Sequence, residues 1–154
     1  MNASFRPEPA DPHFAERCRA SFGRQRAMAL IGARMAAIAC GSCEIELPFR
    51  AELTQQRGYV HGGIVGMIAD TACGYAAYSL MPASASLVTV EYKINILAPG
   101  RGERLLARAE VIKSGRTLSI ARGEVYAEQS GAQTLCAVMQ QTLMMLPDTL
   151  DVPE

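Results

Sequence analysis

The sequence predicts an α+β fold in which a long antiparallel sheet wraps around one central helix, with an extra helix at the N-terminus. Three observations carry this prediction: a nearly uncharged helical run at 62–80, period-two alternation after residue 87, and short Gly-containing turns between the later strands. Consecutive strands joined by short turns must be antiparallel, and long sheets curl. An apolar helix fits on the concave side of such a sheet.

The composition indicates a single domain. The chain has 154 residues, 49% of them hydrophobic, and 15 basic residues balance 15 acidic ones. We expect a flexible arm at 1–10, one domain at 11–147 and a tail at 148–154. A net charge of zero without charge runs argues against a nucleic-acid partner. The first residues contain no apolar segment typical of a secretory signal, so a cytoplasmic location is expected.

The first helix is expected to begin with Asp11 as N-cap and Pro12 at the first helical position, and to run to about Gly23. Residues 28–38 are ambiguous, because apolar residues fall on both parities and fit either a strand or a helix end. A strand then follows Gly41. Its predicted buried face carries Ile45, Leu47 and Phe49.

The central helix is predicted from an apolar segment in which Asp70 is the only full charge between Gly58 and Val90. Its apolar residues recur at helical spacing, and Pro82 closes the segment. A membrane span is rejected, because a carboxylate near the middle costs about 2.5–3.5 kcal/mol on insertion scales. We therefore expect a buried helix and no membrane partner.

The period changes to two from Leu87 to Pro99, which predicts a long strand. Three more strands are predicted at about 105–111, 117–127 and 134–145. The five cysteines include one C-x-x-C pair, Cys40 and Cys43, but no second pair accompanies it, and the two histidines are not spaced as ligands. No metal site is therefore predicted.

Two glycines open the central helix in the segment His61-Gly62-Gly63. The first N–H groups of a helix have no internal partner, and glycine allows a ligand to approach the backbone closely. Such donors suit the oxyanion formed in acyl transfer. The alternative is a glycine-rich helix start without any ligand.

Asp70 is the second candidate. Burying a carboxylate in an apolar helix costs several kcal/mol unless partners compensate, so folding alone gives little reason for it. The alternative is a carboxylate that caps a loop or pairs with Arg or Lys. Gly62 and Asp70 lie eight positions apart, about 12 Å along a helix, so one chain cannot bring both to one carbonyl. Two antiparallel copies of the helix in a homodimer would.

The chain resembles the hotdog-fold acyl-CoA thioesterases of the PaaI-like branch, the phenylacetate-pathway and 4-hydroxybenzoyl-CoA thioesterase family, over roughly residues 40–146. The resemblance is carried by His61-Gly62-Gly63 with Asp70 nine residues after the histidine, the strand V-T-V-E-Y-K-I-N-I-L-A-P, and the turn K-S-G-R-T at 113–117. It implies a hotdog fold, dimers that pair into tetramers, and active sites shared between protomers.

The resemblance also implies roles for single residues. Asp70 corresponds to the carboxylate that attacks the thioester or activates water, and Gly62 to the oxyanion donor. His61 lies beside that donor, Gln55 is expected to orient water or the thioester, and Thr89 to lie near the water. Substrate contacts are expected from three further residues, one of them in a turn where a coenzyme A phosphate could bind: Gly63, Asn95 and Arg116.

The predicted function is hydrolysis of an acyl-CoA thioester without metal or bound cofactor, since coenzyme A is part of the substrate. Two alternatives stay open, an acyl-CoA hydratase or dehydratase and a non-catalytic acyl-CoA-binding dimer. A third reading uses Cys73 as a nucleophile and is disfavoured, because a thiol in an apolar helix is inert. The sequence leaves the acyl group undefined.

Overall fold

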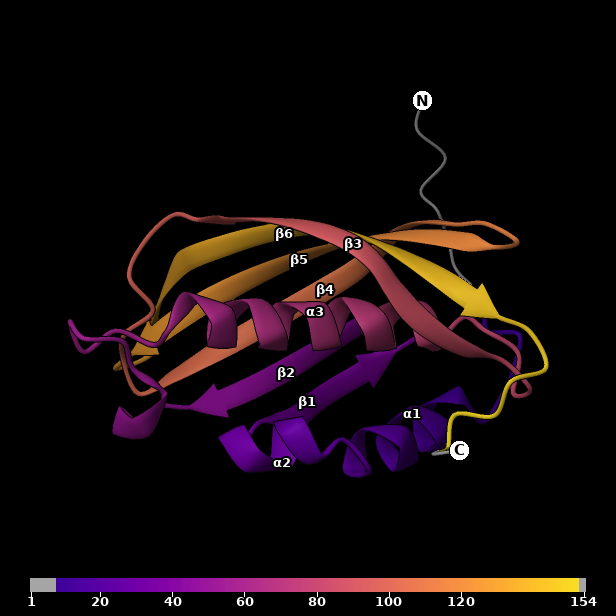
Figure 1. Ribbon diagram of the computed structural model, residues 1–154, viewed down its shortest axis with the longest axis horizontal. Helices are drawn as coiled ribbons and strands as arrows, with labels where there is room; N and C mark the ends of the chain where they lie inside the picture. Colours follow the sequence, from indigo (N-terminus) through magenta and orange to yellow (C-terminus); the bar gives the residue numbers. More distant parts are fainter. Residues whose placement is uncertain (1–7, 153–154) are drawn as a thin grey trace.

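One long helix, α3 (Gly62–Tyr78), lies in the concave face of a six-stranded antiparallel sheet (Figure 1). The computed structural model describes residues 8–152. The predicted α+β hotdog fold, with its central and N-terminal helices, is confirmed. The strands are β1 (Arg34–Ala39), β2 (Ser42–Pro48), β3 (Ser86–Ile96), β4 (Arg104–Ser114), β5 (Leu118–Gln129) and β6 (Ala132–Leu146), in the order β1-β2-β4-β5-β6-β3.

The N-terminal helix α1 (Phe14–Gly23) begins later than predicted, because His13 and not Asp11 holds the N-cap position. Asp11 still organises the helix start. Its carboxylate accepts the N–H of His13 at 2.9 Å and pairs with Arg17 at 2.8 Å, and these bonds hold its pKa below the usual value. Most of the predicted arm, residues 1–7, and the last two residues of the predicted tail lie outside the described residues.

The ambiguous segment contains both kinds of structure. A second helix, α2 (Arg26–Ile31), ends at Gly32, whose φ of 77° suits glycine, and β1 starts two residues later. The predicted face of β2 is correct for Ile45 and Leu47, which are fully buried. It is wrong for Phe49, because the strand ends at Pro48 and leaves this ring 39% exposed. A short 3₁₀ turn, η1 (Ala51–Leu53), follows.

α3 packs closely on the middle of the sheet. A Cβ placed on Gly123 of β5 would lie 3.0 Å from Cys73 Sγ and 3.7 Å from the carbonyl oxygen of Ala69. A larger residue here would force the Cys73 side chain or the helix to move by a few tenths of an ångström. The close packing fixes the height of α3, and hence of Asp70, above the strands.

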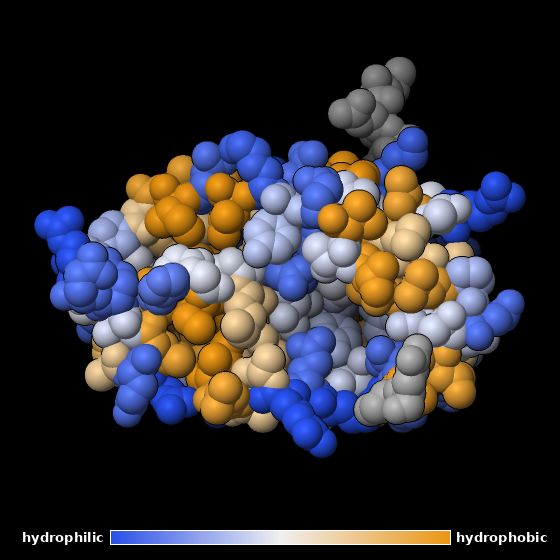
Figure 2. Space-filling model, viewed as in Figure 1, coloured by the Kyte–Doolittle hydropathy of each residue, from blue (hydrophilic) through white to orange (hydrophobic). Residues whose placement is uncertain are grey.

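The edge strand β3 departs from simple alternation. Its pairing with β6 shifts between Thr89 and Glu91, which is a β-bulge. Four of its large apolar residues are 41–52% exposed in this chain: Val88, Val90, Tyr92 and Ile96. Figure 2 shows hydrophobic side chains along the band that β3 follows in Figure 1. The two-residue period therefore predicts the strand but not which of its residues are covered.

No helix within residues 8–152 is both long and apolar enough to cross a bilayer.

Candidate active site

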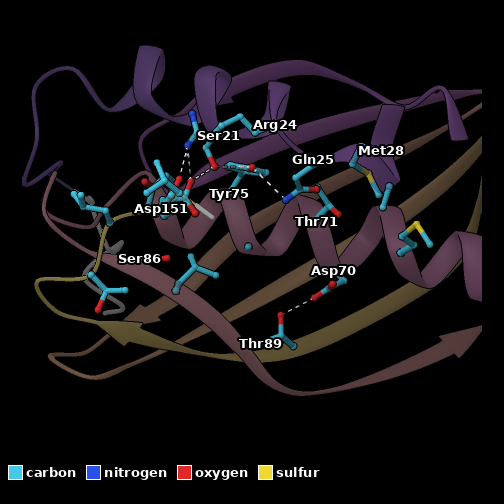
Figure 3. A pocket seen from close by; sticks show the side chains of 18 residues that line it. Ser21, Arg24, Gln25, Met28, Asp70, Thr71, Tyr75, Ser86, Thr89 and Asp151 are labelled. Atoms are coloured by element: carbon cyan, nitrogen blue, oxygen red, sulfur yellow. Dashed lines mark hydrogen bonds and ion pairs between the residues drawn. The ribbon is translucent and has the colours of Figure 1, made fainter. Parts of the chain in front are cut away.

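A cavity of about 620 Å³ opens beside the second half of α3. Its walls come from the N-terminal helices, α3, the start of β3 and the C-terminal segment 149–152. Figure 2 shows this hollow below the band of β3, and Figure 3 shows its lining side chains. Asp70 and Thr89 line it together. The other predicted site residues do not.

Asp70 lies half-buried in the cavity wall, not sunk in an apolar core as the sequence suggests. Thr89 Oγ1 donates to Asp70 Oδ1 at 2.8 Å, a bond drawn in Figure 3. Gln141 Nε2 donates to the same oxygen at 2.5 Å. Both donors bind the same carboxylate oxygen, Oδ1. The other oxygen, Oδ2, accepts no hydrogen bond from the described residues.

The expected alternative, a structural ion pair with Arg or Lys, is not found for Asp70 among the described residues. Among residues 8–152, Arg24 is the one Arg or Lys that lines the cavity, and it pairs with Asp151 at 3.0 Å. Asp70 therefore keeps a carboxylate oxygen available for chemistry with a ligand in the cavity. A free carboxylate oxygen can accept a proton from water or attack a carbonyl carbon.

The second group of predicted residues lies at the N-terminus of α3. His61 is the N-cap residue, and its Nδ1 accepts the N–H of Gly63 at 2.9 Å. The proton of a neutral His61 ring is therefore on Nε2. The N–H of Gly63 is engaged by this cap, whereas the N–H of Gly62 has no acceptor within the described residues. Gly62 is exposed, and no atom lies within 4 Å of the place where its Cβ would be.

A tight loop positions this helix start. Thr54 and Val60 form an isolated antiparallel bridge, and the N–H of Val60 donates to the carbonyl of Gly100 at 2.8 Å. Within the loop, Gln55 Oε1 accepts the N–H of Arg57, so this side chain stabilises its own turn. Its amide nitrogen makes no hydrogen bond to the described residues and can donate to water or a thioester.

The remaining predicted residues lie apart. Asn95 is exposed near the end of β3, where its Oδ1 accepts a hydrogen bond from Lys93. Arg116 is exposed in the turn between β4 and β5, without an ion pair to the described residues. In a single chain the structure thus gives two separate groups, the Asp70 group at the cavity and the His61 group at the helix start.

The residue missed by sequence reasoning is Gln141 of β6. Every second residue from Leu135 to Met145 is apolar except this one, which is fully buried. A polar residue at an inward-facing position of a strand is a signal that was available in the sequence.

A second polar cluster occupies the far end of the cavity (Figure 3). Gln25 Nε2 donates to the hydroxyl of Tyr75 at 3.2 Å, and Tyr75 bonds Ser21 at 2.9 Å. Ser21 in turn donates to Asp151 of the C-terminal segment, which Arg24 also binds. The contacts of Ser21 and Arg24 with Asp151 join residues 130 and 127 positions apart. No sequence pattern predicts them.

Cys73 is fully buried one turn after Asp70. Burial, and then the charge of Asp70, raise the pKa of its thiol to about 12. A thiol with this pKa is a poor nucleophile near neutral pH. Within residues 8–152, no group of three or more His, Cys, Asp or Glu side chains is arranged to hold a metal ion.

Comparison with known proteins finds the Thioesterase superfamily, whose profile matches residues 57–133. The chain is similar to the crystal structure of a thioesterase family protein from Silicibacter pomeroyi, with 47% identity, a TM-score of 0.86, and coverage of 87% of this chain and 98% of that one. It shares the fold of the Escherichia coli PaaI protein from the phenylacetic acid degradation operon, with 21% identity, a TM-score of 0.80, and coverage of 89% and 96%.

Among curated proteins, a medium/long-chain acyl-CoA thioesterase of Escherichia coli is 25% identical over 83 residues, which are 46% of this chain and 54% of that protein. The chain spans about half the length of the first curated relatives that it matches, 56% for each of two.

Proposed function

The chain belongs to the Thioesterase superfamily, and from this premise we propose that it hydrolyses acyl-CoA thioesters to a free acid and coenzyme A. The observation that carries the proposal is the Asp70 carboxylate in the cavity wall, with Oδ1 held by two donors and Oδ2 free. The name of the Escherichia coli relative supports the choice of acyl-CoA.

In the proposed reaction, the acyl carbonyl lies between Asp70 Oδ2 and a backbone N–H donor. Asp70 removes a proton from water as the water oxygen attacks the carbonyl carbon, and the carbonyl oxygen becomes an oxyanion that accepts a hydrogen bond from the N–H of Gly62 of the partner subunit. When the C–S bond breaks, coenzyme A leaves as thiolate and takes up the proton, so that acid and thiol are the products. Alternatively, Asp70 attacks the carbonyl carbon itself, the thiolate leaves, and water then hydrolyses the resulting mixed anhydride to the same acid and regenerates the carboxylate.

The active unit that we propose is a homodimer. α3 is continuous from Gly62 to Tyr78, so Gly62 and Asp70 of one chain lie about 12 Å apart and cannot act on one carbonyl. β3 is an edge strand with exposed apolar side chains, and such an edge is rarely left open. Pairing of two β3 edges about a twofold axis would bring antiparallel α3 helices together, with two equivalent sites. Pairing of two such dimers into a tetramer remains a prediction.

The test is a panel of aryl-, alkyl- and enoyl-CoA thioesters. Thiol release, detected with a disulfide reagent, is expected from wild type and about 10²–10⁴-fold more slowly from Asp70→Asn. Loss of enoyl absorbance without free thiol would indicate a hydratase instead. Binding of acyl-CoA without turnover, equal in wild type and Asp70→Asn, would indicate a binding protein and contradict the proposal.

A further inference from the structure

Gln141 is placed where folding alone would select an apolar residue. It lies on β6 between Met139 and Leu143 on the inward face, and its side chain is fully buried. Its Nε2 lies within hydrogen-bond distance of two oxygens, 2.5 Å from Asp70 Oδ1 and 2.8 Å from Thr89 Oγ1. Thr89 also donates to Asp70 Oδ1, so the three side chains form a closed triangle.

The other end of the Gln141 amide is not satisfied. Its Oε1 is buried and has no hydrogen-bond partner in the described part of the chain, one of two such side-chain atoms found there. An unsatisfied buried acceptor is destabilising, and such atoms in native proteins require an explanation. A methionine of similar length would fill the same space without this penalty. The amide thus serves its contacts to Asp70 and Thr89 and leaves its own acceptor unpaired.

We infer that Gln141 is the positioning residue of Asp70, an inference that rests on the proposed thioesterase function. Gln141 and Thr89 each supply one donor to Asp70 Oδ1. Together they fix the rotation of the carboxylate about the Cβ–Cγ bond of Asp70. Oδ2 is left as the one oxygen that faces the reacting groups. Without Gln141, the Thr89 hydroxyl is the single remaining donor and the carboxylate can turn, so a smaller share of molecules has Oδ2 aimed at the water.

The first experiment compares Gln141→Met with Gln140→Met. Gln140 is the adjacent exposed glutamine, and it makes no side-chain hydrogen bond to the described residues, so it is a matched control. Gln141→Met is expected to lower kcat about 10–100-fold, as loss of outer hydrogen-bond partners does at other sites. Its KM and its affinity for a non-hydrolysable acyl-CoA thioether should stay within about twofold of wild type, and its Tm should stay within about 4 °C of wild type, because the lost contacts and the removed unpaired acceptor offset each other. Gln140→Met should match wild type.

The second experiment separates positioning from a general structural role. In an Asp70→Asn background no carboxylate remains to be aimed, so adding Gln141→Met should lower the residual kcat by less than twofold. A structural role would give the same loss in both backgrounds and would overturn the inference. Equal kcat of Gln141→Met and wild type would overturn it alone, whereas a wild-type protein without thiol release would overturn the proposed function as well.

Discussion

The two ends of the cavity are each built around a carboxylate and a hydroxyl, yet they differ in what is left unpaired. At the far end, Asp151 accepts from Ser21 and pairs with Arg24, and Tyr75 is bonded on both sides by Ser21 and Gln25. The near end, where Asp70 lies, has no Arg or Lys among the described residues that line the cavity. There, Asp70 Oδ2 has no hydrogen bond from the described part of the chain.

This difference separates a structural cluster from a catalytic one. The far cluster is neutralised within itself, and its bonds tie the C-terminal segment to α1, so its role is to close the cavity wall. The near cluster is held in place but retains an unpaired carboxylate oxygen and a buried amide oxygen without a partner. Incomplete pairing of this kind marks a functional site, because it is destabilising unless a ligand uses it.

The largest expected effect comes from making the same change at both ends. Asp70→Asn should lower kcat about 10²–10⁴-fold, since it removes the base or nucleophile, while Tm changes little. Asp151→Asn should leave kcat within about twofold. It should lower Tm by about 2–4 °C, because Asp151 and Arg24 are partly exposed and a loss near 1 kcal/mol is expected. Steady-state kinetics and thermal unfolding decide both, and a large kcat loss in Asp151→Asn would refute the distinction.

The next effect concerns the backbone donor that should face Asp70 across the dimer. Gly62→Pro removes the N–H but keeps the helix, because proline suits the first helical position and His61 before it has an extended ψ of 136°. We expect kcat to fall about 10²–10³-fold. Gly62→Ala keeps the N–H and meets no atom within 4 Å, so it should remain close to wild type.

Mixing the two inactive variants sharpens this result. When Asp70→Asn and Gly62→Pro chains are unfolded and refolded together, about half of the dimers are mixed, and each mixed dimer has one intact site. The mixture should therefore recover about one quarter of wild-type activity if sites are shared. A mixture as inactive as its components would show that sites are not shared between chains.

Most of the near end could be predicted from the sequence, and most of the far end could not. Asp70 and Gly62 are conspicuous because they interrupt or open an apolar run, a local signal. Thr89 of β3 and Gln141 of β6 meet Asp70 of α3, so their roles depend on the register between these strands. The bulge after Thr89 changes which residues face α3, and no local pattern specifies it. The far cluster joins α1 to the C-terminal segment, and no periodicity in the sequence predicts these contacts.

A smaller effect is expected from Tyr75→Phe at the far end. At neutral pH the variant should lose about 1 kcal/mol of unfolding free energy, because the hydroxyl bonds Ser21 and Gln25. Burial raises the pKa of Tyr75 to about 12, so the folded state keeps a proton that the unfolded state releases near pH 10. Wild type therefore loses stability as the pH rises from about 10 to 12, and its advantage over the variant should shrink in that window.

Denaturant unfolding at pH 8, 10 and 11 measures this difference. Burial also raises the pKa of thiols such as Cys18, to about 12, and this likewise lowers the stability of the protein as the pH rises. These thiols are present in both proteins, so their effect cancels in the comparison. kcat at neutral pH should be unchanged within about twofold, because the far cluster makes no bond to Asp70. An advantage that is constant from pH 8 to 11 would mean that Tyr75 is not shielded from solvent.

The smallest expected effect is that of Cys73→Ala on turnover. Cys73 is one helical turn from Asp70, the right spacing for a nucleophile, but its buried thiol with a pKa of about 12 is almost entirely protonated at neutral pH. The variant should keep wild-type kcat, and the native thiol should not react with a disulfide reagent on the timescale of the assay. The unfolding free energy of Cys73→Ala should be about 1 kcal/mol lower than that of wild type, because the sulfur that is removed packs against Gly123. Loss of turnover without loss of fold would transfer the catalytic role from the carboxylate to the thiol, and the contrast between the two ends of the cavity would no longer locate the chemistry.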